Sequence, residues 1–280
     1  MKQAPRPAPP PLLLAMRGAA TAMLLWFGWQ LLLAQLFEMP PVWAIGWMAL
    51  LAAAFVVLHA WPGRWNRRIR AAARPRGFAR SAGWLALTAP AMVALPLALW
   101  VVLTALGLLP DQEYPREVTA FLERPGGELA FVLLAVAMAP LMEEFAFRGW
   151  LLGALRRPLG PGPAVAAAAV LFAVAHAHMP AVPIYLAAGL VLGQAAIATR
   201  SVWAAVVLHA CWNAGLLAVD AVFPGLDPEG KGWAWVAPAA VAAALSVMWC
   251  AWGVQGMHDR AALRPAGPGG AARGRPVESP

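Results

Sequence analysis

Long apolar runs, each followed by a short polar segment, repeat along most of the chain. A helix needs roughly 20 mainly apolar residues to cross a lipid bilayer. On that criterion we predict eight transmembrane helices, near residues 19–37, 42–61, 82–109, 129–155, 164–180, 182–199, 202–223 and 233–254. The pattern therefore predicts an all-α fold, that of a polytopic membrane protein with about eight transmembrane helices.

The composition argues against a soluble protein. Hydrophobic residues make up 61% of the 280 residues and charged residues only 12%, whereas a soluble domain is roughly half apolar and roughly a quarter charged. A soluble fold would need a core far larger than this chain can enclose. Cys211 and Cys250 lie in apolar runs without a CxxC spacing, so we expect buried side chains rather than a disulfide or a zinc knuckle.

Basic residues collect on one predicted side of the membrane. With eight helices, 17 of the 21 Lys and Arg residues fall on the side of the two termini, seven of them in residues 62–81. Cytoplasmic loops carry an excess of Lys and Arg, so we predict cytoplasmic termini and a multi-pass protein of the inner (cytoplasmic) cell membrane. The net charge of +8 does not indicate nucleic acid, because the basic residues lie in short loops without interleaved aromatic residues.

Five consecutive regions follow from these patterns. They are a cytoplasmic N-terminal tail (1–18), N-terminal transmembrane helices with an acidic outer loop (19–127), a helical core that holds the embedded polar residues (128–223), a last transmembrane helix (224–258) and a disordered cytoplasmic tail (259–280). We expect a short interfacial helix within residues 111–128. The chain shows no internal repeat of the kind that marks many transporters.

Three charged residues, Glu143, Glu144 and Arg148, interrupt the fourth predicted helix. A charge at the bilayer centre costs roughly 2.5–3.5 kcal/mol on insertion scales and usually indicates function. Glu144 and Arg148 have the i,i+4 spacing of a pair on one helix face, whereas Glu143 points about 100° away and is free to face a cavity. The alternative is a buried ion cluster that only fixes helix packing.

Polar residues also occur in the fifth and seventh predicted helices. His176 and His178 diverge by about 200° on a helix, so we do not expect both in one site, and we place His178 at the membrane interface. His209 and Asn213 form an i,i+4 pair on one helix face. Interhelical hydrogen bonding would explain that pair equally well.

Together these helices offer a carboxylate, two imidazoles and an amide in an apolar interior. A glutamate and an imidazole can deprotonate a water, and another imidazole with an amide can donate hydrogen bonds to a tetrahedral oxyanion. Alternatively, Glu143, His176 and His209 would hold a zinc ion with a water in the fourth position. The chain has no HExxH, GxSxG or Cys–His arrangement of other proteases.

Three motifs in this order resemble those of the CPBP family, the CAAX proteases and bacteriocin-processing enzymes, which includes the type II CAAX prenyl endopeptidases. The motifs are EExxxR from Glu143 to Arg148, FxxxH from Phe172 to His176, and HxxxN from His209 to Asn213. The resemblance covers approximately residues 128–220. It implies an intramembrane endopeptidase of eight helices, with a cavity open toward the cytoplasm or the lipid.

The resemblance also implies a role for each motif residue. Glu143 would activate the water with help from His176, His209 and Asn213 would stabilise the oxyanion, and the second acid and the arginine of EExxxR would support them. The family has been described both as metalloproteases and as metal-independent glutamate proteases, so zinc on Glu143, His176 and His209 stays open.

We therefore predict a CAAX-protease-like hydrolase that cleaves a peptide or a membrane-associated protein. We expect its other partner to be the lipid bilayer, and we do not expect it to bind nucleic acid. A prenylated C-terminus is the eukaryotic precedent, whereas this Ala- and Arg-rich chain looks bacterial, and unmodified peptides or membrane proteins suit bacterial relatives better. One alternative is a non-catalytic membrane scaffold or an immunity or regulatory protein of the same fold. The other is a transporter or proton relay, which the absence of an internal repeat disfavours.

Overall fold

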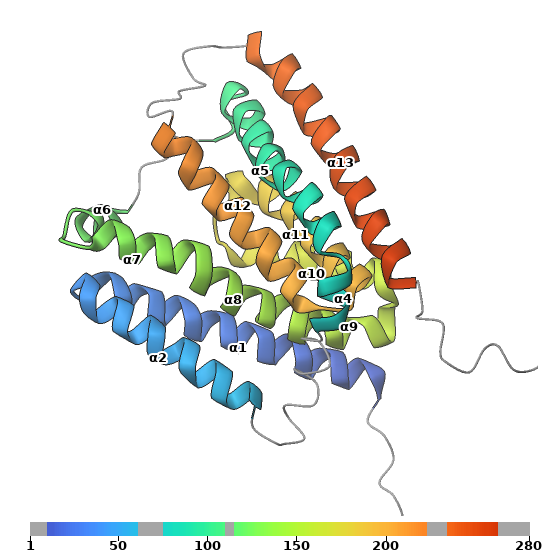
Figure 1. Ribbon diagram of the computed structural model, residues 1–280, viewed down its shortest axis with the longest axis horizontal. Helices are drawn as coiled ribbons and strands as arrows, with labels where there is room; N and C mark the ends of the chain where they lie inside the picture. Colours follow the sequence, from blue (N-terminus) through green and yellow to red (C-terminus); the bar gives the residue numbers. More distant parts are fainter. Residues whose placement is uncertain (1–9, 61–74, 110–114, 223–233, 263–280) are drawn as a thin grey trace, which may run out of the picture.

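The protein is mainly helical in the part that the structure, a computed structural model, describes: residues 10–60, 75–109, 115–222 and 234–262. No β-strand occurs among these residues (Figure 1). The elements are α1 (Pro11–Glu38), α2 (Pro41–Ala60), α4 (Pro75–Arg80), α5 (Ala82–Ala105), α6 (Arg116–Leu122), α7 (Gly127–Leu133), η1 (Leu134–Met138), α8 (Ala139–Glu144), η2 (Phe145–Leu151), α9 (Leu152–Leu159), α10 (Pro161–Ala175), η3 (Met179–Ala181), α11 (Val182–Thr199), α12 (Val202–Val222) and α13 (Val236–Ala262).

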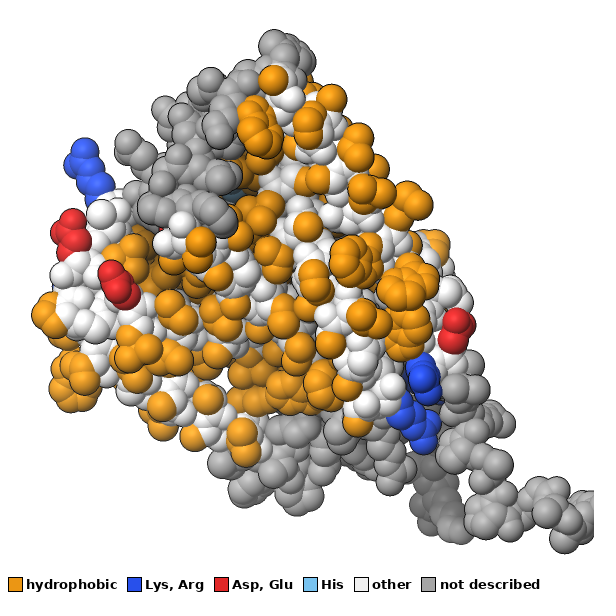
Figure 2. Space-filling view, turned by 45° about the horizontal axis from the view of Figure 1, so that its top comes forward, with side chains coloured by type: hydrophobic (Ala, Val, Ile, Leu, Met, Phe, Trp, Pro, Cys, Tyr) orange, Lys and Arg blue, Asp and Glu red, His pale blue; other side chains and the backbone are white. Residues whose placement is uncertain are grey.

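The helices have the length and surface of membrane-spanning segments. Within the described residues, six helices are long and apolar enough to cross a membrane, and Pro41–Val56 and Pro161–Ala175 are shorter apolar helices. Figure 2 shows a broad band of hydrophobic side chains, with charged side chains toward the two ends of that view. The chain is an all-α polytopic membrane protein, as the apolar pattern predicted. The crossing number of eight and the cytoplasmic termini stay predictions.

Both predicted tails overlap with helices. α1 begins at Pro11, inside the predicted tail of residues 1–18, because a proline at the first helical position loses no hydrogen bond and an apolar run follows it directly. α13 continues to Ala262, so the predicted disordered tail from residue 259 starts within a helix. Gln255 Nε2 donates to Asp259 Oδ1 at 2.9 Å across the last turns of this helix. Residues 1–9 and 263–280 lie outside the described residues.

α10 ends earlier than the predicted residue 180. Its last residue is Ala175, and Ala177 has a φ of 53°, in the left-handed region, which ends the α-helical path. His176 therefore caps the helix, and His178 lies beyond it, just before η3. In the acidic outer segment, α6 provides the short helix that the sequence predicted.

Two groups of helices pack together, and the candidate residues lie where the groups meet. One apolar core is built mainly from α1, α2, the helices of 127–159 and α10, and a second mainly from α5, α11, α12 and α13. α12 contacts η1, α8 and η2 and so joins the two groups (Figure 1). Polar side chains on α8, α10 and α12 can therefore face one another in the interior.

Two π-helical segments, η1 and η2, widen the helical path through residues 127–159. In η1 the Ala139 N–H donates to the Leu134 carbonyl, five residues back. Pro140 follows, and in a regular α-helix its ring would clash with the Val136 carbonyl. The wider turn accommodates the proline. It also leaves the Ala135 carbonyl without an intrahelical donor, because its partner at a five-residue spacing would be Pro140, which has no N–H.

Candidate active site

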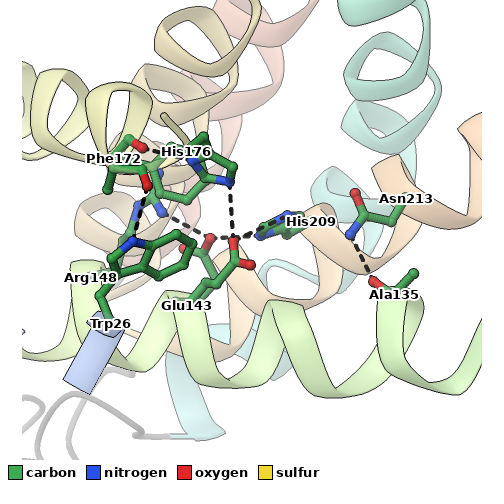
Figure 3. Close-up of polar contacts among 10 residues, drawn as sticks. Trp26, Ala135, Glu143, Arg148, Phe172, His176, His209 and Asn213 are labelled. Carbon is green, nitrogen blue, oxygen red and sulfur yellow. Dashed lines mark hydrogen bonds and ion pairs between the residues drawn. The ribbon is translucent and has the colours of Figure 1, made fainter. Parts of the chain in front are cut away.

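Three side chains from separate helices converge on one point (Figure 3). Glu143 comes from α8, His176 from the end of α10 and His209 from α12. Glu143 Oε2 lies 3.7 Å from His176 Nε2 and 3.9 Å from His209 Nε2. Glu143 is buried, and its Oε2 has no hydrogen-bond partner. The structure thus brings together three of the residues proposed from the sequence, but it does not bring His178 into this group.

Glu144 and Arg148 form a buried network beside these three residues. Glu144 Oε1 accepts hydrogen bonds from Arg148 Nη1 and from His209 Nδ1, each at 2.8 Å. Arg148 Nη2 donates to the Gly189 carbonyl at 3.1 Å, and its guanidinium carbon lies 4.3 Å from the Phe172 ring centre. The Glu144–Arg148 pair has the predicted i,i+4 geometry. The sequence did not show that Glu144 also holds His209.

Hydrogen bonds at Nδ1 fix how both imidazoles face Glu143. His176 Nδ1 lies 2.7 Å from the Phe172 carbonyl, which can only accept, so this nitrogen carries a hydrogen. His209 Nδ1 donates to the Glu144 carboxylate in the same way. In each ring the other nitrogen, Nε2, is the atom that points toward Glu143 Oε2.

The Asn213 amide binds the backbone of the helix that carries Glu143. Asn213 Nδ2 donates to the Ala135 carbonyl at 2.7 Å, the carbonyl that η1 and Pro140 leave free. In Figure 3 the amide points toward Ala135 and lies apart from Glu143. One N–H of the amide is therefore used to join α12 to η1, and the second is free to bind another acceptor.

Aromatic rings enclose the two imidazoles, and the sequence motifs did not predict them. Tyr185 stacks on His176 with ring centroids 4.1 Å apart, and Trp212 stacks on His209 at 5.2 Å. Trp26 of α1 lies 5.2 Å from His176. In an apolar chain such residues resemble ordinary core or lipid-facing positions. The one available signal was the rarity of tyrosine, since Tyr185 is one of only two.

The atoms that face one another are of the types that zinc binds, two imidazole nitrogens and a carboxylate oxygen. Among the residues that the structure describes, however, no group of three or more His, Cys, Asp and Glu side chains has the arrangement of a metal site. The same three atoms can also surround a water without a metal. The carboxylate and one imidazole would then accept the hydrogen bonds that the water donates.

One comparison with known proteins matches this part of the chain. A family model described as type II CAAX prenyl endopeptidase Rce1-like matches residues 125–215, which include all the candidate residues. No curated protein and no solved structure matches the chain. The matched family suggests CAAX-type intramembrane protease activity. Over residues 125–215, this chain therefore matches the Rce1-like type II CAAX prenyl endopeptidases, as its three sequence motifs indicated.

Proposed function

We propose that this protein is an intramembrane endopeptidase that uses Glu143 to activate a water for peptide-bond hydrolysis. One observation carries the proposal: a buried carboxylate oxygen without a partner faces two imidazole Nε2 atoms at 3.7 and 3.9 Å. A buried polar atom without a partner costs free energy, so this arrangement favours a bound water or substrate group. A water, which both donates and accepts hydrogen bonds, would satisfy the carboxylate oxygen and the imidazole nitrogens that face it.

Charge balance assigns a different role to each histidine. With Glu143 and Glu144 ionised and Arg148 positive, the buried group carries one uncompensated negative charge, which an apolar interior disfavours. We place one additional proton on His209, because its Nδ1–H bonds the Glu144 carboxylate, whereas His176 Nδ1 bonds only a backbone carbonyl. His209 Nε2–H is then a donor, and His176 Nε2 is an acceptor.

The hydrolysis then proceeds through one tetrahedral intermediate. A water held by Glu143 Oε2 and His176 Nε2 gives a proton to Glu143 while its oxygen forms a bond to the scissile carbonyl carbon. His209 Nε2–H and the second N–H of Asn213 donate to the oxyanion that forms. As the C–N bond breaks and the C=O bond re-forms, Glu143 returns the proton to the leaving nitrogen, which gives a free amine and a carboxylic acid.

Glu144 and Arg148 support this reaction without contacting the substrate. Glu144 holds the His209 ring through Nδ1, and Arg148 neutralises Glu144 and fixes it to the α11 backbone at Gly189. If zinc were bound instead, Glu143, His176 and His209 would be its ligands, and it would supply an activated water. Metal analysis of the purified protein tests this second chemistry.

The membrane orientation belongs to the same proposal. The start of α1, α4, the end of α9 and the end of α13 all lie toward the lower right of Figure 1. These ends adjoin the segments in which the basic residues collect, so they support a single basic side. We propose that this side is cytoplasmic, in the inner membrane of a cell.

The experiment that tests the function compares peptides in cells that express either the wild-type protein or Glu143→Gln. We expect cleavage products of a peptide or membrane protein only with the wild type, and the uncleaved substrate to accumulate with the variant. Glu123→Gln, at an exposed position on the same chain, is the matched control and should behave as wild type. Identical peptide profiles for Glu143→Gln and the wild type would instead favour the non-catalytic scaffold.

A further inference from the structure

An aromatic residue of α1 lies against the helix end that carries His176. Trp26 Nε1 donates to the Ala175 carbonyl at 3.0 Å, and the centroids of the indole and of the His176 imidazole are 5.2 Å apart. Figure 3 shows the indole beside this histidine. Trp26 is only 3% exposed. It lies outside residues 125–215, the segment that matches the family model, so family membership assigns it no role.

The end of α10 needs such a contact. Ala175 is the last residue of the helix, and a carbonyl at this position has no partner within the helix. Two residues later Ala177 has a φ of 53°, a conformation that residues other than glycine adopt at a cost and keep only where the surroundings enforce it. Two side-chain donors bind the carbonyls of this last turn: His176 Nδ1 binds Phe172, and Trp26 Nε1 binds Ala175.

The indole itself has little freedom to move. Its ring meets Phe147 edge-on, with centroids 5.5 Å apart. Toward the start of α1, a Cβ added at Gly18 would clash with the Cβ of Ala154, so α1 and α9 approach closely there. Trp26 is two helical turns further along, roughly 12 Å at 1.5 Å per residue. The close approach of α1 and α9 thus sets the position of Trp26 along the helical stretch 127–159, which also carries Glu143.

We propose that Trp26 is a positioning residue for His176. Its indole N–H holds the end of α10, and its ring and that of Tyr185 limit rotation of the imidazole, so that Nε2 keeps facing Glu143. This inference rests on the proposed function, since His176 matters here as the acceptor beside Glu143. It means that the segment 125–215 does not hold the complete site and that α1 supplies a part of it.

Trp26→Phe tests the proposal, with Trp29→Phe as its matched control. Both tryptophans lie on α1 and are 3% exposed, but Trp29 Nε1 has no hydrogen-bond partner. Trp26→Phe keeps an aromatic ring and removes the bond to Ala175, whereas Trp29→Phe makes the same change of ring size without the loss of a hydrogen bond. Because one net hydrogen bond holds the productive geometry, we expect kcat for the cleaved peptide to fall roughly 2- to 12-fold, with KM unchanged. Trp29→Phe should leave kcat unchanged.

A second readout does not depend on turnover. The ¹⁵N resonances of the His176 ring, measured in protein with labelled histidine, should report a protonated Nδ1 in the wild type and in Trp29→Phe. In Trp26→Phe they should shift or broaden as the ring samples other orientations, while those of His209 stay unchanged. If kcat and the His176 resonances of Trp26→Phe match those of Trp29→Phe while Glu143→Gln is inactive, the role of Trp26 is wrong and the proposed function stands. If Glu143→Gln retains full activity, the proposed function fails, whatever the resonances show.

Discussion

Replacing Arg148 with methionine would leave a buried carboxylate without its counter-ion. The Arg148 and Glu144 side chains are 1% and 0% exposed, so water cannot replace the missing guanidinium. Removing one partner of a buried ion pair typically costs about 3–5 kcal/mol. The Gly189 carbonyl also loses the hydrogen bond from Arg148 Nη2. We therefore expect Arg148→Met to lower the free energy of unfolding by about 3–5 kcal/mol, although methionine fills much of the same space.

The same reasoning predicts partial recovery in a double variant. Adding Glu144→Gln removes the uncompensated charge, and the side-chain oxygen of the introduced glutamine can still accept the hydrogen bond from His209 Nδ1. The double variant should therefore be more stable than Arg148→Met, with a coupling energy between the two sites of about 2 kcal/mol, within the range for residues in one network.

Thermal unfolding of the purified protein in a mild detergent measures this effect. For a larger domain 1 kcal/mol shifts the Tm by about 2–4 °C, so Arg148→Met should lower it by roughly 10 °C. Arg157→Met, at an exposed position of α9, is the control and should change it little. The reasoning fails if Arg148→Met loses no more stability than Arg157→Met, or if the losses of Glu144→Gln and Arg148→Met simply add.

Three further changes test other parts of the structure. Arg124 Nη1 donates to three carbonyls at the end of α1, at 3.1 to 3.4 Å. Arg124→Gln should therefore lower the free energy of unfolding, measured by thermal unfolding, by about 1–2 kcal/mol. An unchanged free energy of unfolding would show that this contact does not stabilise the protein. A Cβ at Gly256 would clash with the Trp84 ring, so Gly256→Ala should destabilise the α5–α13 contact by about 1–3 kcal/mol. Gly46→Ala, which meets nothing within 4 Å, should be neutral or stabilising, and the same sign for both glycines would contradict the packing argument. Asn213→Ala should lower kcat by about 10²-fold at unchanged KM, and a change in KM alone would exclude an oxyanion role.

Much of the fold was predictable because membrane helices are encoded by local composition. Each of the eight predicted segments overlaps an apolar helix, and the i,i+4 spacing of Glu144 and Arg148 predicted their ion pair. The helix ends were less predictable. α10 stops at Ala175 because Ala177 adopts a left-handed conformation, and alanine gives no sequence signal for that. Pro140 is visible in the sequence, but the sequence does not show that the helix avoids a clash with this proline by forming the π-turn of η1.

The candidate site was predictable only where it is polar. Ionisable residues are conspicuous in an apolar chain, so the motifs led directly to Glu143, His176 and His209. The rings around them could not be found in this way, because the positions of Trp26 and Tyr185 depend on how distant helices pack. Nor could spacing show that Asn213 reaches Ala135, a contact that depends on the altered hydrogen bonding of η1.

The most direct test of the account is the turnover of Glu143→Gln in proteoliposomes, with the peptide that the cellular comparison identifies as substrate. Losing a general base typically costs about 10²–10⁴-fold in rate, so we expect kcat to fall by at least the lower of these factors. Insertion and thermal unfolding should stay like those of the wild type and of Glu123→Gln. A Glu143→Gln protein that cleaves the peptide within twofold of the wild-type rate would contradict the claim that Glu143 activates the water.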